Sequence, residues 1–131
     1  MSSMKTLGTA ISFLKAVREI DPYIASQTVE CLLEVALRPG LTMQDLADAT
    51  GLAQSSCSRN VAMLSKYRRL GKKGYDLVEA VDDPRERRRK IIYLTPKGLK
   101  LINTIMRNID PAFELKQTSA RDAVNRLYAS A

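Results

Sequence analysis

The sequence predicts a mainly α-helical chain with one small β-hairpin. Apolar residues recur at helical spacing along most of the chain, helix start and stop signals separate the segments, and only residues 77–94 have the composition of strands. The expected order is four helices, a hairpin and two further helices. With 131 residues, the chain has the length of a single domain that buries its own core.

The first two helices are predicted from their apolar stripes. One stripe runs before Asp21-Pro22, where proline removes a backbone donor and ends the helix. The other stops near Pro39-Gly40. The stripes consist of Leu7, Ile11, Leu14 and Val17, and of Val29, Leu32, Leu33 and Ala36.

The next two helices are predicted from their ends. Thr42 precedes Asp45 by three residues, which is the spacing of a capping box at a helix start. Gly51 supplies the left-handed residue that commonly ends a helix. A fourth helix is then expected over about residues 53–67.

The hairpin and the last two helices follow from local signals. Two strand-forming runs, 77–81 and 90–94, flank the turn signal Asp82-Asp83-Pro84. Thr95-Pro96 is an N-cap with proline in the first helical position, and Asp110-Pro111 ends that helix. Ser119 with Asp122 caps a final helix whose apolar face holds Val124, Leu127 and Tyr128.

Residues 43–64 have the spacing of a helix-turn-helix. Ala47 is small enough for two helices to cross closely, Gly51 makes the turn four residues later, and Cys57 locks the pair six residues after that. With the hairpin that follows, these elements predict a winged helix-turn-helix.

The helix over 53–67 is expected to turn a polar and basic face outward. At about 100° per residue, Cys57, Val61 and Leu64 lie on one side and Arg59 on the other. A helix N-terminus favours phosphate, and arginine can donate two hydrogen bonds to a guanine edge. For the first-turn residues, a simple capping role is an equal alternative. The candidate DNA contacts are Gln54, Ser55, Ser56, Ser58 and Arg59.

A second set of candidate contacts is basic. The net charge is +7, and residues 54–73 contain no acidic residue, whereas residues 22–50 are net acidic. Such an arrangement indicates an oriented basic face that holds phosphates, with an ordinary solvated surface as the alternative. The cations concerned are Lys66, Arg68, Arg69, Lys72 and Lys73.

The hairpin tip carries a third set, Arg85, Arg87 and Arg88, followed by Arg89. An arginine on a narrow tip can enter the minor groove, where the negative potential is concentrated. Asp83 or Glu86 is expected to pair with Arg88 and hold the tip. The alternative is an ordinary charged β-turn.

The composition argues against an enzyme or a metal protein. The chain has no histidine, and its two cysteines, Cys31 and Cys57, lack metal-ligand spacing. It has no paired carboxylates in an apolar setting and no glycine-rich phosphate loop, so no catalytic, cofactor-binding or metal-ligating residues are expected. It also has no apolar stretch of membrane-spanning length and no secretory signal, which predicts a cytoplasmic protein without a membrane partner.

Three segments resemble the multiple-antibiotic-resistance regulator (MarR) family of winged-helix transcription factors. They are LTMQDLADATGLAQSSCSRNVAML, the wing motif DPRERR, and LTPKG at the next helix start. The resemblance covers residues 22–109. It implies major-groove contacts from the first candidate set, minor-groove insertion of Arg85 oriented by Asp83, and a backbone contact or internal brace at Arg88.

The resemblance also implies a homodimer. The expected organisation is one domain over residues 1–131, with a winged-helix core over 22–109 and dimerisation helices within 1–21 and 110–131. The expected function is a sequence-specific regulator of transcription that binds double-stranded DNA as a dimeric repressor. The extra basic link 66–73, within the long segment 65–81 before the wing, favours an alternative, a winged-helix module for phage or plasmid replication, partition or architecture. Nothing in the sequence supports a small-molecule effector.

Overall fold

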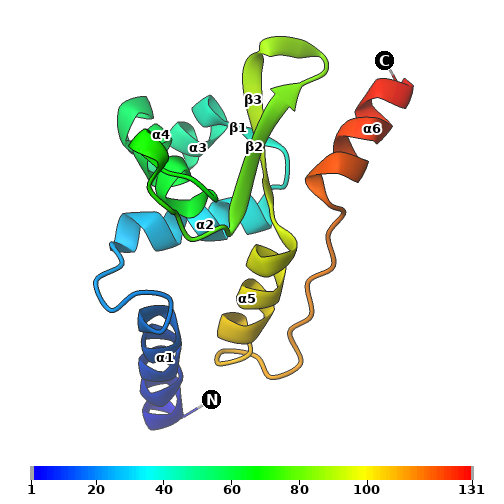
Figure 1. Cartoon of the computed structure of the whole chain (residues 1–131). Coiled ribbons are helices and arrows are strands. Elements are labelled where there is room, and N and C mark those ends of the chain that lie inside the picture. Colours follow the sequence, from blue (N-terminus) through cyan, green and yellow to red (C-terminus); the bar gives the residue numbers. More distant parts are fainter. Residues whose placement is uncertain (1, 131) are drawn as a thin grey trace.

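Residues 2–130 are described in the computed structural model, apart from the side chains of Arg69 and Ser130. This part of the chain forms six α-helices, one short 3₁₀ turn and a three-stranded antiparallel sheet (Figure 1). The elements are α1 (Ser3–Arg18), α2 (Ser26–Leu37), β1 (Leu41–Thr42), α3 (Met43–Thr50), α4 (Gln54–Leu64), η1 (Arg69–Gly71), β2 (Val78–Asp83), β3 (Glu86–Leu94), α5 (Pro96–Met106) and α6 (Ala120–Ser130). The predicted winged helix-turn-helix is therefore confirmed.

The helix-turn-helix is built by α3 and α4 against α2. The predicted capping box is present, because the Thr42 hydroxyl accepts from the backbone N–H of Asp45 at 3.1 Å and the Asp45 carboxylate accepts from that of Thr42 at 3.0 Å. A cap of this kind stabilises a helix by about 1 kcal/mol. Gly51 ends α3 in the left-handed conformation with φ 74°. Leu46, Cys57 and other apolar residues of the three helices fill the core.

The sheet has the strand order β1-β3-β2, and β2 and β3 form the wing. The first strand was not predicted, since only Leu41 and Thr42 belong to it, and they pair with Ile92 and Ile91 of β3. The inner face of the sheet contributes Val78, Ile92 and Leu94 to the main core.

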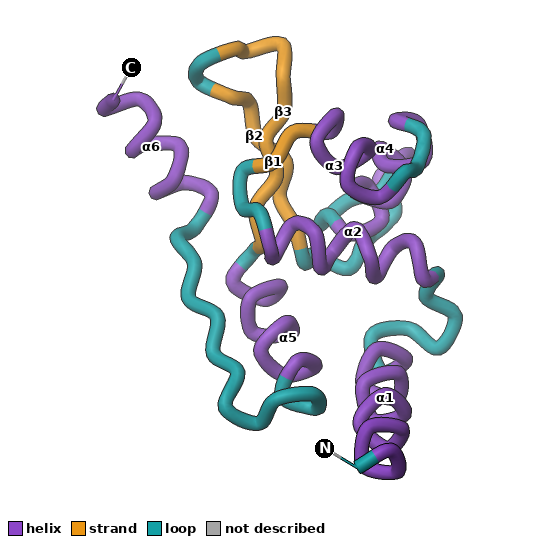
Figure 2. Tube along the Cα trace, turned by 180° about the vertical axis from the view of Figure 1, so that it is seen from behind, coloured by secondary structure: helices purple, strands orange, loops and turns teal. Residues whose placement is uncertain are grey.

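The C-terminal helix α6 covers the outer face of the wing. Ala120 is buried there with Ile91 and Tyr93, and Val124 and Leu127 pack against the same cluster. Figures 1 and 2 show α6 beside the hairpin from both sides. Much of the apolar face of α6 is therefore used within this chain.

The N-terminal helix α1 lies at the opposite end of the molecule from the wing tip (Figures 1 and 2). Only Val17 of its predicted stripe is buried. Leu7, Ile11 and Leu14 are each more than half exposed, and Met4 is exposed beside them. The stripe is thus an uncovered apolar surface of the single chain.

Helix α4 is the second helix of the helix-turn-helix, the position called the recognition helix. It ends at Leu64, three residues before the expected Tyr67. In a longer helix the Met63 carbonyl would accept from Tyr67, but it accepts instead from the backbone N–H of Tyr75 at 2.9 Å. Residues 66–73, which we call the basic arm, form a second hairpin rather than a helical extension. Helix α5 likewise ends at Met106, before the end expected at Asp110-Pro111.

No helix in residues 2–130 is long and apolar enough to cross a membrane. Within the same residues, no group of three or more side chains could hold a metal ion.

Candidate nucleic-acid interface

The recognition helix α4 presents the face that the sequence predicts. Cys57, Val61 and Leu64 are buried, whereas Gln54, Ser55, Ser58 and Arg59 are exposed and Ser56 is half-buried. The N-cap residue, Ala53, has no side chain that could cap the helix. The first-turn amides therefore remain open to an anion, as at phosphate-binding helix ends.

Short-range bonds orient the polar residues of this face. The Gln54 side chain donates to Oε1 of Gln44, which connects α4 to α3. Arg59 donates from Nη2 to the Ser56 hydroxyl at 3.2 Å, so its guanidinium leans toward the helix N-terminus. On the inner side, the Thr28 hydroxyl donates to Oδ1 of Asn60 at 2.7 Å and joins α4 to α2. These bonds hold the outward side chains in a defined array.

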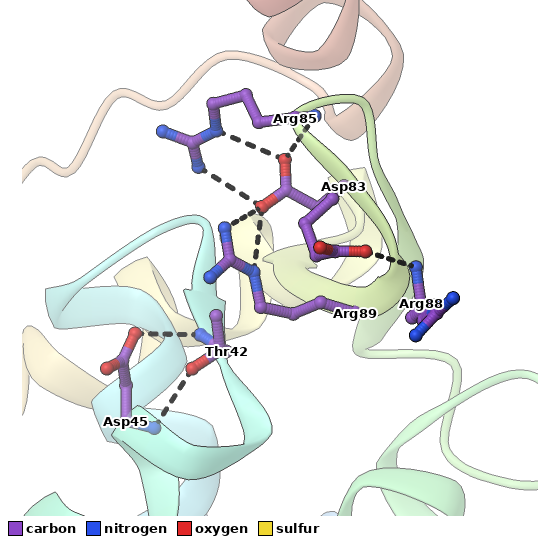
Figure 3. Close-up of polar contacts among 7 residues, drawn as sticks. Thr42, Asp45, Asp83, Arg85, Arg88 and Arg89 are labelled. Atoms are coloured by element: carbon purple, nitrogen blue, oxygen red, sulfur yellow. Dashed lines mark hydrogen bonds and ion pairs between the residues drawn. The ribbon is translucent and has the colours of Figure 1, made fainter.

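The tip of the wing is organised by Asp83, whose side chain has no exposed surface. Figure 3 shows its carboxylate between the guanidinium groups of Arg85 and Arg89. Arg85 donates from Nε at 3.1 Å and from its backbone N–H at 3.0 Å, and Arg89 donates from Nη2 at 2.6 Å. The guanidinium of Arg85 is thereby fixed at the tip while about half of its side chain stays exposed. Asp83 orients Arg85, as the resemblance implied.

The electrostatics agree with this geometry. Burial on its own raises the pKa of Asp83, but the hydrogen bonds from Arg85 and Arg89 outweigh it and lower the pKa to about 2. The same contact raises the pKa of Arg85. Asp83 is therefore an anion at neutral pH, and two cations share it.

Of the two expected partners of Arg88, Glu86 contacts its backbone, whereas Asp83 is bonded by other arginines. The backbone N–H of Arg88 donates to Glu86 at 3.3 Å, but the guanidinium that joins Arg85 on Asp83 belongs to Arg89. A register shift between Asp82 and Asp83 changes which side chains of the two strands meet. Arg87 and Arg88 are exposed on the wing. Arg89 was not among the candidate contacts, and no local sequence signal separates it from its neighbours.

The basic arm carries its cations just beyond the C-terminal end of α4. Lys66, Arg68, Lys72 and Lys73 are all exposed, and Lys66 lies over the ring of Tyr67 at 5.7 Å. For Arg69, the structure describes the backbone in η1, and its side chain lies outside the described part.

Recognition helix and wing lie together, on the far side of the molecule from α1 (Figures 1 and 2). The winged-helix core thus brings the first and third candidate sets to one region. The second set, on the basic arm, is attached at the C-terminal end of α4.

No protein-family model and no curated protein matches this sequence. Solved structures do match. The DNA complex of MepR from S. aureus superposes with a TM-score of 0.66 at 20% identity, over 97% of this chain and 94% of MepR. Reduced AbfR bound to DNA gives 0.60 at 14% identity over 92% and 76% of the two chains, and MarR gives 0.52 at 18% identity over 98% and 86%. The chain therefore has the winged-helix fold of MarR-type transcriptional regulators.

Proposed function

We propose that this protein is a sequence-specific regulator of transcription that binds double-stranded DNA as a dimeric repressor. The observation that carries the proposal is the shared placement of α4 and the wing at the end of the molecule away from α1 (Figure 1), together with the exposed cations that both elements carry. Two of the similar structures, MepR and AbfR, are themselves DNA complexes. The fold together with this surface supports DNA binding and offers nothing that favours an enzyme.

Each part of the surface has its own role in the proposal. The α4 side chains read base edges in the major groove, with Arg59 as the main donor to guanine. Arg85 enters the minor groove, because Asp83 fixes its guanidinium at the tip and leaves it exposed. Arg87 and Arg88 hold phosphates beside it. The α4 residues concerned are Gln54, Ser55, Ser56, Ser58 and Arg59.

We assign the dimer interface mainly to α1. Its stripe of Met4, Leu7, Ile11 and Leu14 is exposed in the single chain, and a contiguous apolar surface of this kind marks a protein interface. Because α6 packs on the wing of its own chain, we assign residues 110–131 mainly to wing support and only their exposed part to dimerisation. The whole chain then acts as one domain with a protruding dimerisation helix. We place the protein in the cytoplasm, where it would have access to DNA.

Selection of bound duplexes from a random pool, followed by footprinting, tests the proposal. A palindromic site with half-sites about one helical turn apart is the expected result. An extended or repeating footprint would support the alternative, a replication, partition or architectural module. An affinity that does not change between about 50 and 200 mM salt would contradict DNA binding altogether, because a protein with several phosphate contacts loses affinity steeply as the salt concentration rises.

A further inference from the structure

The basic arm is a folded hairpin with an apolar residue at its tip. The backbone N–H of Arg68 donates to the Lys72 carbonyl at 2.5 Å, and that of Gly74 donates to the Lys66 carbonyl at 2.9 Å. Tyr67 and Lys73 also pair as an antiparallel β-bridge. Leu70 occupies the tip and is 92% exposed. The arm thus combines a fixed backbone, flanking cations and one projecting leucine.

Neither packing nor backbone conformation explains a leucine at position 70. The side chain buries almost nothing, so it adds little to the core. Its φ of 64° is left-handed, a conformation in which glycine or asparagine is favoured and a leucine is strained. Both effects disfavour leucine within the folded chain. A contact outside the chain would compensate both effects.

The arm is attached to the recognition helix. Besides the bond from Tyr75 to Met63, the backbone N–H of Leu77 donates to Leu64 at 2.7 Å and that of Asp76 donates to Ser65 at 3.2 Å. No acidic residue lies between Asp48 and Asp76, so the basic surface of α4 continues into the arm without interruption. The arm therefore shares the position and the charge of the helix that we propose to read DNA.

We propose that the basic arm is a second DNA-contacting hairpin, in which the cations hold phosphates and Leu70 enters the minor groove. Helix α4 has eleven residues and is about 16 Å long, whereas the major groove is about 12 Å wide. With the N-terminus of α4 in the groove, its C-terminal end therefore reaches the sugar-phosphate backbone. The minor groove lies beyond that backbone. Apolar side chains inserted there are covered by the sugars and bases. This inference rests on the DNA-binding function proposed above.

The first test is Leu70→Asn, with Tyr23→Asn as the matched control. Tyr23 is 93% exposed on the loop between α1 and α2, outside every surface assigned to DNA. Asparagine accepts a left-handed backbone, so Leu70→Asn is expected to keep or raise the Tm. Its affinity for the selected duplex is expected to fall about tenfold, from the lost burial of one leucine, while the control stays unchanged.

Wild-type affinity in Leu70→Asn would overturn the role of the tip. If that variant loses its thermal transition, Leu70→Gly replaces it, because glycine adopts the same φ freely. Loss of binding to anionic phospholipid vesicles in Leu70→Asn, with DNA affinity intact, would instead assign the arm to a membrane surface and overturn the proposal.

The second test removes arm charge with Lys72→Gln and Lys73→Gln together. The slope of log affinity against log salt is expected to become shallower by about 2, with sequence preference unchanged. The control pair, Lys100→Gln with Lys116→Gln, removes equal charge from α5 and the segment after it and is expected to keep the slope. A wild-type slope in the arm variant contradicts this inference alone, whereas a wild-type protein without salt-dependent binding contradicts the proposed function.

Discussion

Arg89 donates from Nη2 to Oδ2 of Asp83 across 2.6 Å, from the middle of β3 to the end of β2. The same carboxylate accepts from Arg85 in the turn, so one buried anion holds both strands and the turn between them. Two cations on one anion leave a net positive charge at the tip. The contact therefore shapes the wing and preserves its attraction for DNA.

Asp83→Asn is expected to loosen the wing tip. The substitution keeps the size of the side chain but leaves Arg85 and Arg89 without their anion, so Tm falls by a few degrees. DNA affinity falls by roughly tenfold, about the contribution of one good base contact, because Arg85 is no longer held. Binding assays and thermal melts measure both effects. Asp82→Asn is the control, since that carboxylate is mostly exposed beside Lys90; an equal loss there would contradict the role of Asp83.

The contribution of Asp83 to stability has a defined pH window. Its pKa is lowered to about 2 in the folded chain, against an ordinary value of about 3.9 when unfolded. A lowered carboxyl pKa stabilises the fold above the unfolded value, and this stabilisation is lost as the pH falls through the folded value. The difference in Tm between wild type and Asp83→Asn is expected to be constant above about pH 5 and to shrink toward pH 2. A difference that grows in acid would refute the assignment.

Signals contained within a few residues predicted the structure well. The Thr42 and Asp45 capping box, the left-handed Gly51 and the Thr95 cap of α5 all formed as expected. In each case the hydrogen-bonding partners lie within four residues of one another, so the local sequence determines the conformation. The outward face of α4 followed in the same way, because helical spacing fixes which residues oppose Cys57 and Leu64.

Features that depend on distant partners were missed. The end of α4 depends on Tyr75, twelve residues beyond the carbonyl of Met63 that it occupies. The partnership of Asp83 with Arg89 depends on a register shift that no local pattern announces. Strand β1 is too short to show strand periodicity and exists through its pairing with β3.

Arg59→Ala is expected to relax sequence preference. Arg59 lies on the outward face of α4, and an arginine that bonds a guanine contributes about 1–3 kcal/mol of discrimination, which is roughly five- to 150-fold. Competition between the selected duplex and single-base variants measures the change at each position. Arg87→Ala serves as comparison, since a phosphate contact weakens all duplexes alike. Unchanged discrimination in Arg59→Ala would remove this residue from base reading.

Ile11→Lys is expected to convert the dimer to a folded monomer. The side chain is 54% exposed in the single chain, so lysine is tolerated there, but its charge would be buried in the α1 interface. Sedimentation velocity measures the mass, and the Tm reports the fold at the same time. Ser12→Lys adds the same charge on an adjacent face of α1 and is expected to remain a dimer. A dimer in Ile11→Lys would place the interface elsewhere.

Tyr75→Phe is expected to reduce discrimination between operators of different half-site spacing. The Tyr75 hydroxyl donates to Asp21 at 2.7 Å and so joins the loop after α1 to the base of the basic arm and, through Met63, to α4. Burial and this bond raise the pKa of Tyr75 to about 12, so the donor stays protonated at any working pH.

Without that bond, the angle between the dimerisation helix and the recognition helix is less constrained. Affinity for a single half-site should remain at the wild-type level. The loss of affinity for the full operator on adding one base pair between its half-sites should become smaller than in the wild type. Titrations of duplexes with the selected spacing and with one added base pair measure this difference. Tyr23→Phe, which removes a hydroxyl from an exposed tyrosine of the same loop, should behave as wild type. Equal spacing discrimination in Tyr75→Phe and wild type would show that the bond carries no information between the two helices.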